Sequence, residues 1–95
     1  MTDCTIYGHE IQNEAMLHDA LAKTLRLPAW YGRNLDALHD CLTDLTEATT
    51  LTIYGWDALS AALGARAERV KRALEDAAAE NPAFSVRLLE AADEI

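Results

Sequence analysis

Apolar residues recur along this chain with two different spacings, and each spacing predicts one kind of element. Runs of alternating or clustered apolar residues, bounded by glycine or proline, predict strands. Apolar residues three or four positions apart predict helices, and Asn13 and Asn34 are good N-caps for the first two. The predicted strands are 4–7, 51–54 and 84–89, and the predicted helices are 13–25, 34–45, 57–63 and 65–80.

The order of these elements predicts the fold class. Helical connections between successive strands indicate a parallel sheet, because a parallel pair needs a long crossover connection. The 95 residues contain no repeat and no linker, so we expect one α/β domain over 1–95. A sheet of three parallel strands is small, and about four helices must therefore supply most of the core. Residues 91–95 are expected to fray.

Leucines and acids occupy different sides of the predicted helix 34–45. At about 100° per residue, one side carries the leucines and the other the acids. The leucines are Leu35, Leu38, Leu42 and Leu45, and the acids are Asp36, Asp40, Asp44 and Glu47. Like charges one turn apart destabilise a helix, and anions near its C-terminus oppose its dipole. Such a face is either simply solvated or kept for a cationic partner. No lysine or arginine occurs between Arg33 and Arg66, and this lack favours the interpretation that the face binds a cationic partner.

His39 and two aromatic residues flank this acidic face and leave alternatives open. His39 projects between the leucines and the acids, where it either hydrogen-bonds a neighbour or contacts a partner in a pH-dependent way. Trp30 and Tyr31 either pack on the following helix or anchor an interface. Asp36, His39 and Asp40 also resemble half of a metal site, but one helix supplies too few ligands. We therefore expect no metal and no cofactor.

The last helix has basic residues early and acidic residues late, which opposes its dipole at both ends. Pairs four residues apart, 68–72, 71–75 and 72–76, are expected to offset part of this cost. Asp76 and Glu80 remain a like-charged pair. If this end lies beside helix 34–45, it extends the acidic surface.

Composition narrows the possible partners. The net charge of −8 argues against nucleic acid and anionic membranes and favours a basic protein. No apolar run could span a membrane, and the N-terminal sequence does not suggest secretion, so a cytoplasmic location is expected. Cys4 and Cys41 lack metal-type spacing and are expected to be buried thiols. No catalytic or phosphate-binding motif is present, so we expect no enzyme.

The stretch from Leu27 to Thr43 resembles the barstar family of ribonuclease inhibitors. The specific part of the match is Tyr31-Gly32-x-Asn34-Leu35-Asp36-Ala37-Leu38-x-Asp40. The resemblance implies a three-stranded parallel sheet packed on helices, and an intracellular inhibitor, monomeric when free, that covers the active site of a small basic ribonuclease. The contact positions that it implies are Trp30, Asn34, Asp36, Asp40 and, at the edge, Thr43, with Asp76 or Glu80 from the last helix.

Three departures from the family pattern bear on the partner. His39 and Leu45 stand where aromatic residues are expected, and Arg33 stands where an acid can occur. With His39 and Asp44 added to the contact set, the leading hypothesis is an inhibitor or immunity protein that neutralises a ribonuclease or ribonuclease-like toxin. The alternatives are a binding module for another basic protein and, third, an enzyme using Asp36, His39 and Asp40.

Overall fold

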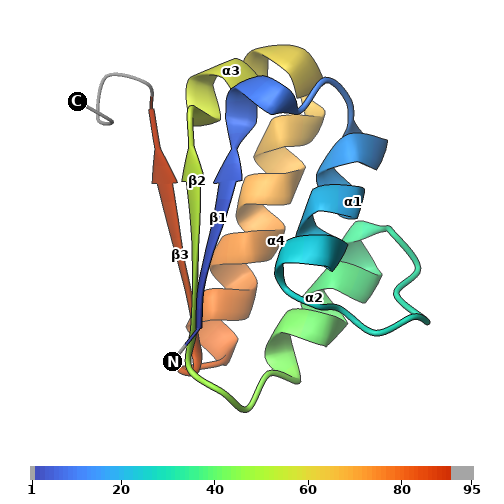
Figure 1. The fold of residues 1–95 in the computed structure, drawn as a ribbon, viewed down its shortest axis with the longest axis vertical. Helices are drawn as coiled ribbons and strands as arrows, with labels where there is room; N and C mark the ends of the chain where they lie inside the picture. The colour runs from blue at the N-terminus through green and yellow to red at the C-terminus, as the bar shows by residue number, and fades with distance from the viewer. Residues whose placement is uncertain (1, 91–95) are drawn as a thin grey trace.

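Three parallel strands form a sheet in the order β1-β2-β3, and helices cover one of its faces (Figure 1). The computed structural model describes residues 2–90. Its elements are β1 (Thr2–Tyr7), the 3-10 turn η1 (Gly8–Glu10), α1 (Glu14–Thr24), α2 (Leu35–Thr43), β2 (Thr49–Tyr54), α3 (Trp56–Leu63), α4 (Arg66–Glu80) and β3 (Phe84–Leu89). The predicted α/β fold with a three-stranded parallel sheet and four α-helices is confirmed. The predicted fraying of 91–95 lies outside the described residues.

The central strand β2 sets the register of the sheet. Thr49 is paired with Thr2 on one side and with Phe84 on the other, and all three strands stay in step to their ends. Side chains alternate between the two faces of a strand. Leu51 and Ile53 of β2 are fully buried on the face that the helices cover. The apolar side of the sheet therefore faces the helices.

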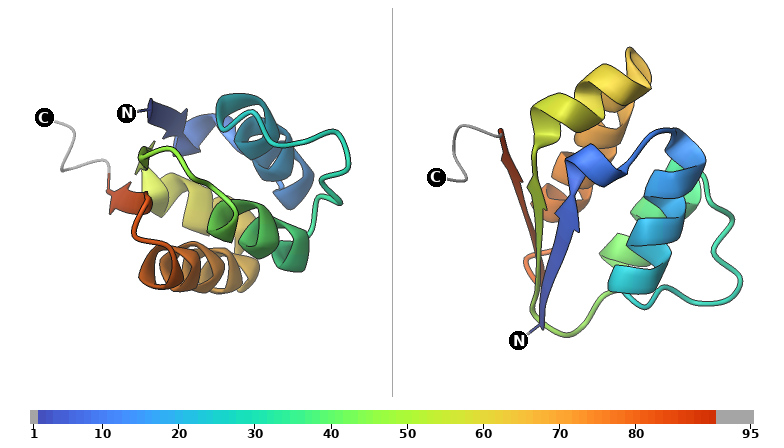
Figure 2. Two further views of the ribbon diagram at one scale, coloured as in Figure 1. Left: turned by 90° about the horizontal axis from the view of Figure 1, so that it is seen from below. Right: turned by 45° about the horizontal axis from the view of Figure 1, so that its top comes forward.

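The helices form a layer on that face, with α2 at its outer side. Helix α1 packs against β1 and α4 packs against β3, whereas the main contact of α2 is α4. Figure 2 shows the same arrangement from two further directions. Leu38 and Leu42 are fully buried, so one side of α2 belongs to the core while its other side meets solvent.

Several boundaries differ from the predicted ones. Strands β1 and β2 each begin two residues earlier, because their first residues are polar and give no apolar signal although they pair in the sheet. Helix α2 ends at Thr43, so Leu45 lies outside it, although Leu45 still packs against the core. The turn η1 was not predicted. It requires Gly8, because a Cβ there would collide with the carbonyl oxygen of Gly55.

Burial confirms the predicted leucine side of helix 34–45: Leu38 and Leu42 are fully buried, and Leu35 and Leu45 are partly buried against the core. Met16 follows the apolar spacing of α1 but is one of the exposed large apolar residues. Cys4 and Cys41 are buried free thiols, as expected, and burial raises the pKa of both. Within residues 2–90, no helix combines the length and the apolar character needed to cross a bilayer.

Candidate functional site

The N-terminus of α2 is fixed by Asn34. Its side-chain oxygen accepts a hydrogen bond of 2.8 Å from the backbone N–H of Ala37, and its amide donates to the carbonyl of Gly32 at 3.2 Å. Arg33 has a positive φ of 54° and forms an ion pair with Asp19 on α1. Asn34 therefore has the predicted capping role, and it stays exposed beside the acidic face.

The two aromatic residues before α2 have different roles. Trp30 is 67% exposed, whereas Tyr31 is only 7% exposed and its hydroxyl is hydrogen-bonded to Nδ1 of the buried His18. Burial raises the pKa of Tyr31. Tyr31 therefore packs within the fold, which is the first of the two alternatives given for these residues. Trp30 is presented to solvent next to the acidic helix.

Three carboxylates on α2 face solvent. Asp36, Asp40 and Asp44 are all exposed, and none has an ion-pair partner within 4.0 Å among residues 2–90. Asp44 is the C-cap, with its backbone N–H donating to the carbonyl of Asp40 at 3.2 Å. The prediction that Glu47 is a fourth acid on this side of the helix is wrong. Glu47 lies beyond the helix and accepts a hydrogen bond from the Thr2 hydroxyl at 2.9 Å. The acidic face, as the term is used below, is Asp36, Asp40 and Asp44.

His39 connects α2 to the end of α4. Its Nε2 is in contact with a carboxylate oxygen of Glu80, and one third of its side chain is exposed. The alternative in which His39 bonds a neighbour is therefore the one seen in the free chain. Because its ring turns to Glu80, His39 does not join Asp36 and Asp40 in a cluster. Residues 2–90 contain no group of three or more potential ligands that could hold a metal ion.

Thr43 closes the last turn of α2. Its hydroxyl lies 2.9 Å from the carbonyl oxygen of His39 and 3.2 Å from that of Asp40, and it donates its single proton to these acceptors. The side chain is half-buried. Thr43 therefore lies beside Asp40, as the predicted site requires, but its hydrogen-bonding capacity as a donor is used inside the helix.

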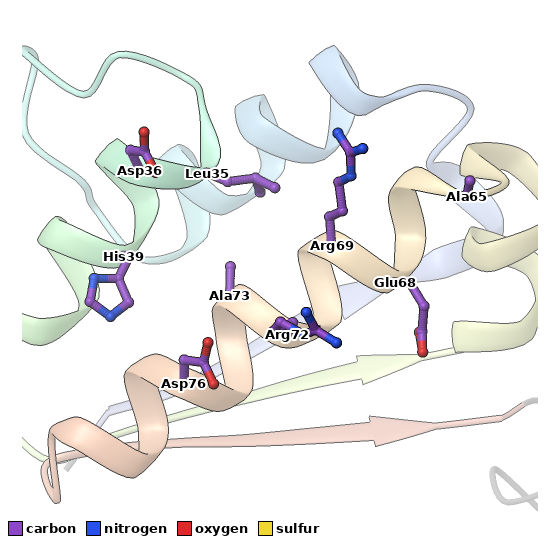
Figure 3. A pocket seen from close by; sticks show the side chains of 9 residues that line it. All are labelled: Leu35, Asp36, His39, Ala65, Glu68, Arg69, Arg72, Ala73 and Asp76. Carbon is purple, nitrogen blue, oxygen red and sulfur yellow. The ribbon is translucent and has the colours of Figure 1, made fainter.

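A groove of about 490 Å³ runs between α2 and α4 (Figure 3). Leu35, Asp36 and His39 line it from the α2 side. From the α4 side it is lined by Glu68, Arg69, Arg72, Ala73 and Asp76, with Ala65 just before the helix. The structure therefore brings Asp76 into one depression with Asp36 and His39. Glu80 lies outside the groove lining and joins the site only through its contact with His39.

The expected pairs along α4 do not form. Among the described residues, no ion pair within 4.0 Å joins positions 68 and 72, 71 and 75, or 72 and 76. Arg69 and Arg72 instead line the groove beside α2. The spacing of residues along α4 alone does not indicate this position of the arginines, because the groove is formed by α2 and α4 together.

Asn81 is another residue whose role the sequence did not indicate. It is buried, and its amide donates to the carbonyls of Leu42 at 2.8 Å and Leu45 at 2.9 Å. Its side-chain oxygen accepts from the N–H of Ala83 at 3.0 Å. These carbonyls lie at and just after the end of α2, where backbone acceptors lack full helical pairing, and the carbonyl of Leu42 has a long bond of 3.4 Å from the N–H of Leu45. Asn81 therefore fixes the end of α2 that carries Asp40 and Asp44.

Comparison with known proteins decides the family. The family model described as barstar, the barnase inhibitor, matches residues 1–89. The chain belongs to the barstar family. A relative from Bacillus subtilis (strain 168), named "Putative ribonuclease inhibitor YrdF", is 37% identical over 78 residues, which cover 81% of this chain and 86% of the relative. The resemblance to the barstar family found in the stretch from Leu27 to Thr43 is thus confirmed, and the match extends over nearly the whole chain.

Proposed function

We propose that this barstar-family chain is an inhibitor that binds a small basic ribonuclease, or a ribonuclease-like toxin, and blocks its active site with the acidic face. The observation that carries the proposal is the geometry of Asp36, Asp40 and Asp44, three exposed carboxylates on α2 and its C-cap with no cation within ion-pair distance among the described residues. Like charges at this spacing weaken a helix. A cationic partner removes that repulsion.

Carboxylates can occupy a ribonuclease active site because they imitate phosphate. Arginine and lysine side chains that grip the phosphates of RNA form charge-assisted hydrogen bonds with carboxylate oxygens in the same way. Asp40 stands at the middle of the acidic face, and the barstar resemblance assigns it to the phosphate site of the enzyme. In this proposal the chain acts by occlusion in the cytoplasm of the producing cell, as a monomer that forms a one-to-one complex, without a cofactor.

The residues around the acidic face supply the rest of the interface. Trp30, at 67% exposed, is the aromatic anchor, since large rigid side chains are enriched at interface centres. Asn34 and Thr43 border the two ends of α2. Asp76 is the acid that α4 contributes, because it lines the groove with Asp36 and His39, whereas Glu80 acts by orienting His39.

The proposal is tested by capture followed by an RNA-cleavage assay. The immobilised chain is exposed to the secreted proteins of its source culture, and the retained protein that cleaves RNA is purified; we refer to it as the captured ribonuclease. The proposal requires that such a protein is retained and that the free chain suppresses its activity. Retention of a basic protein without nuclease activity would instead favour a binding module for another basic protein. Turnover by the chain itself, lost on chelation, would favour an enzyme.

Association with the captured ribonuclease should depend strongly on salt. The net charge of −8 attracts a basic partner at long range, and screening shortens that range to about 8 Å at physiological ionic strength. We therefore expect the association rate to fall steeply as salt is added while the dissociation rate changes little. Stopped-flow mixing across a salt series measures both rates. An association rate that stays flat would contradict electrostatic steering by the acidic face.

His39→Trp should change partner choice more than stability. His39 is one third exposed at the edge of the groove, so its replacement should shift the free energy of unfolding by no more than about 1 kcal/mol. The larger ring displaces the contact with Glu80 and alters the surface next to Asp40. The ranking of affinities for barnase and the captured ribonuclease should therefore change. An unchanged ranking together with a loss of stability well above about 1 kcal/mol would place His39 in the core instead.

A further inference from the structure

The groove between α2 and α4 carries opposite charges along its length. Asp76 and Asp36 lie toward one end with His39, and Arg69 and Arg72 lie further toward the start of α4, as Figure 3 shows. Glu68 lies beyond the two arginines, so they stand between acids on both sides. Leu35 and Ala73 supply an apolar surface between the charged groups. An inhibitor that used only negative charge to hold a basic enzyme would gain nothing from arginines at this position.

The two arginines have no ion-pair partner in the free chain. Arg69 and Arg72 are exposed, and among residues 2–90 neither makes a side-chain hydrogen bond or an ion pair within 4.0 Å. No acid of the same groove lies within ion-pair distance of them, including Glu68 and Asp76, which are one turn away on α4. Their hydrogen-bonding capacity is therefore available to a binding partner.

We propose that Arg69 and Arg72 form a second contact zone, which receives an acidic side chain that the ribonuclease carries beside its basic active site. This proposal rests on the function proposed above and adds the chemistry of its partner. A carboxylate suits the two arginines because each guanidinium presents several N–H donors in a planar fork. Leu35 and Ala73 place apolar surface beside the arginines, and an ion pair formed there becomes stronger once a bound partner covers the groove and lowers the effective dielectric constant.

The second zone makes the inhibitor selective among basic ribonucleases. The acidic face alone would attract any basic active site. A ribonuclease with a lysine or arginine opposite Arg69 and Arg72 would meet like charges and bind poorly, whereas one with a carboxylate there would be favoured. Specificity often combines attraction to the right partner with repulsion of the wrong one. Carboxylates and arginines in one groove provide both the attraction and the repulsion.

The test compares two double variants that change the net charge equally. Arg69→Gln with Arg72→Gln removes the second zone, and Lys23→Gln with Arg87→Gln removes two exposed cations that do not line the groove. Both make the chain more negative by two charges, so both should associate with the captured ribonuclease at least as fast as the unmodified chain. We expect the groove variant to dissociate about tenfold faster and the control to dissociate at the original rate.

The outcomes separate this inference from the proposed function. If the groove variant dissociates no faster than the control, the second zone is wrong, although the acidic face still stands if Asp40→Asn weakens binding. If no ribonuclease is captured, or if Asp40→Asn leaves binding unchanged, the proposed function fails and the second zone fails with it. Thermal melts of the free variants show whether a change in folding is responsible. Arg72→Glu paired with the opposite charge change in the ribonuclease should restore slow dissociation.

Discussion

Asp40→Asn is expected to weaken binding of the captured ribonuclease by at least about 2 kcal/mol, roughly 30-fold, because it removes a charge-assisted contact and leaves cations of the enzyme buried without a partner. The same change should leave the free chain as stable or slightly more stable. Asp40 has Asp36 and Asp44 one turn away on either side, and removing its charge relieves repulsion of a few tenths of a kcal/mol per pair. Thermal melts and titration against the captured ribonuclease measure the two effects.

A matched control for Asp40→Asn is Glu75→Gln. Glu75 is an exposed acid on α4 that does not line the groove, so the substitution removes one negative charge away from the acidic face. It should slow association slightly through the lower net charge and leave dissociation unchanged. Opposite effects on folding and binding at Asp40 are expected of a residue kept for function at a cost to stability. A clear loss of stability with unchanged affinity would make Asp40 a structural residue.

Asn81→Ala is expected to cost about 3 kcal/mol of unfolding free energy. The substitution removes three hydrogen bonds in a partly or fully buried setting. It leaves the carbonyl of Leu45 without its side-chain donor and the carbonyl of Leu42 with backbone donors alone, such as the N–H of Leu45 at 3.4 Å. Urea denaturation measures the loss. Below the transition the chain should still bind the captured ribonuclease nearly normally, because Asn81 is buried and does not belong to the acidic face.

Asn13→Ala provides the comparison for Asn81→Ala. Asn13 is an exposed N-cap whose side chain accepts one hydrogen bond of 2.9 Å from the N–H of Met16, and its loss should cost about 1 kcal/mol. The two substitutions delete the same atoms from the same residue type. A cost at Asn81 no larger than that at Asn13 would show that the link between the ends of α2 and α4 adds little to stability.

Local signals in the sequence predicted the elements well. The N-caps Asn13 and Asn34 occupy the positions expected of them, and the strand Phe84–Leu89 has its predicted bounds. Capping and periodicity depend on neighbours within a few residues, so they can be recognised in one sequence. The acidic face could be predicted for the same reason, up to the end of α2.

The parts that could not be predicted depend on residues far apart in the chain. Helix α2 ends at Thr43 rather than near Leu45, where the carbonyls of Leu42 and Leu45 accept from the amide of Asn81 at the end of α4. Tyr31 and Trp30 are neighbours in sequence, but only Tyr31 has His18 within reach. Arg72 was expected to pair along its own helix, yet it lies in a groove that exists only because α2 packs on α4.

The most direct test of the inhibitor hypothesis is the RNA-cleavage rate of the captured ribonuclease as the chain is added in increasing amounts. If the chain covers the active site with its acidic face, RNA-cleavage activity should fall linearly and reach zero at one chain per enzyme. The Asp40→Asn variant should require a large excess to reach the same inhibition. RNA cleavage that persists when the enzyme is saturated with the chain would contradict this account, because the bound chain would then lie away from the active site.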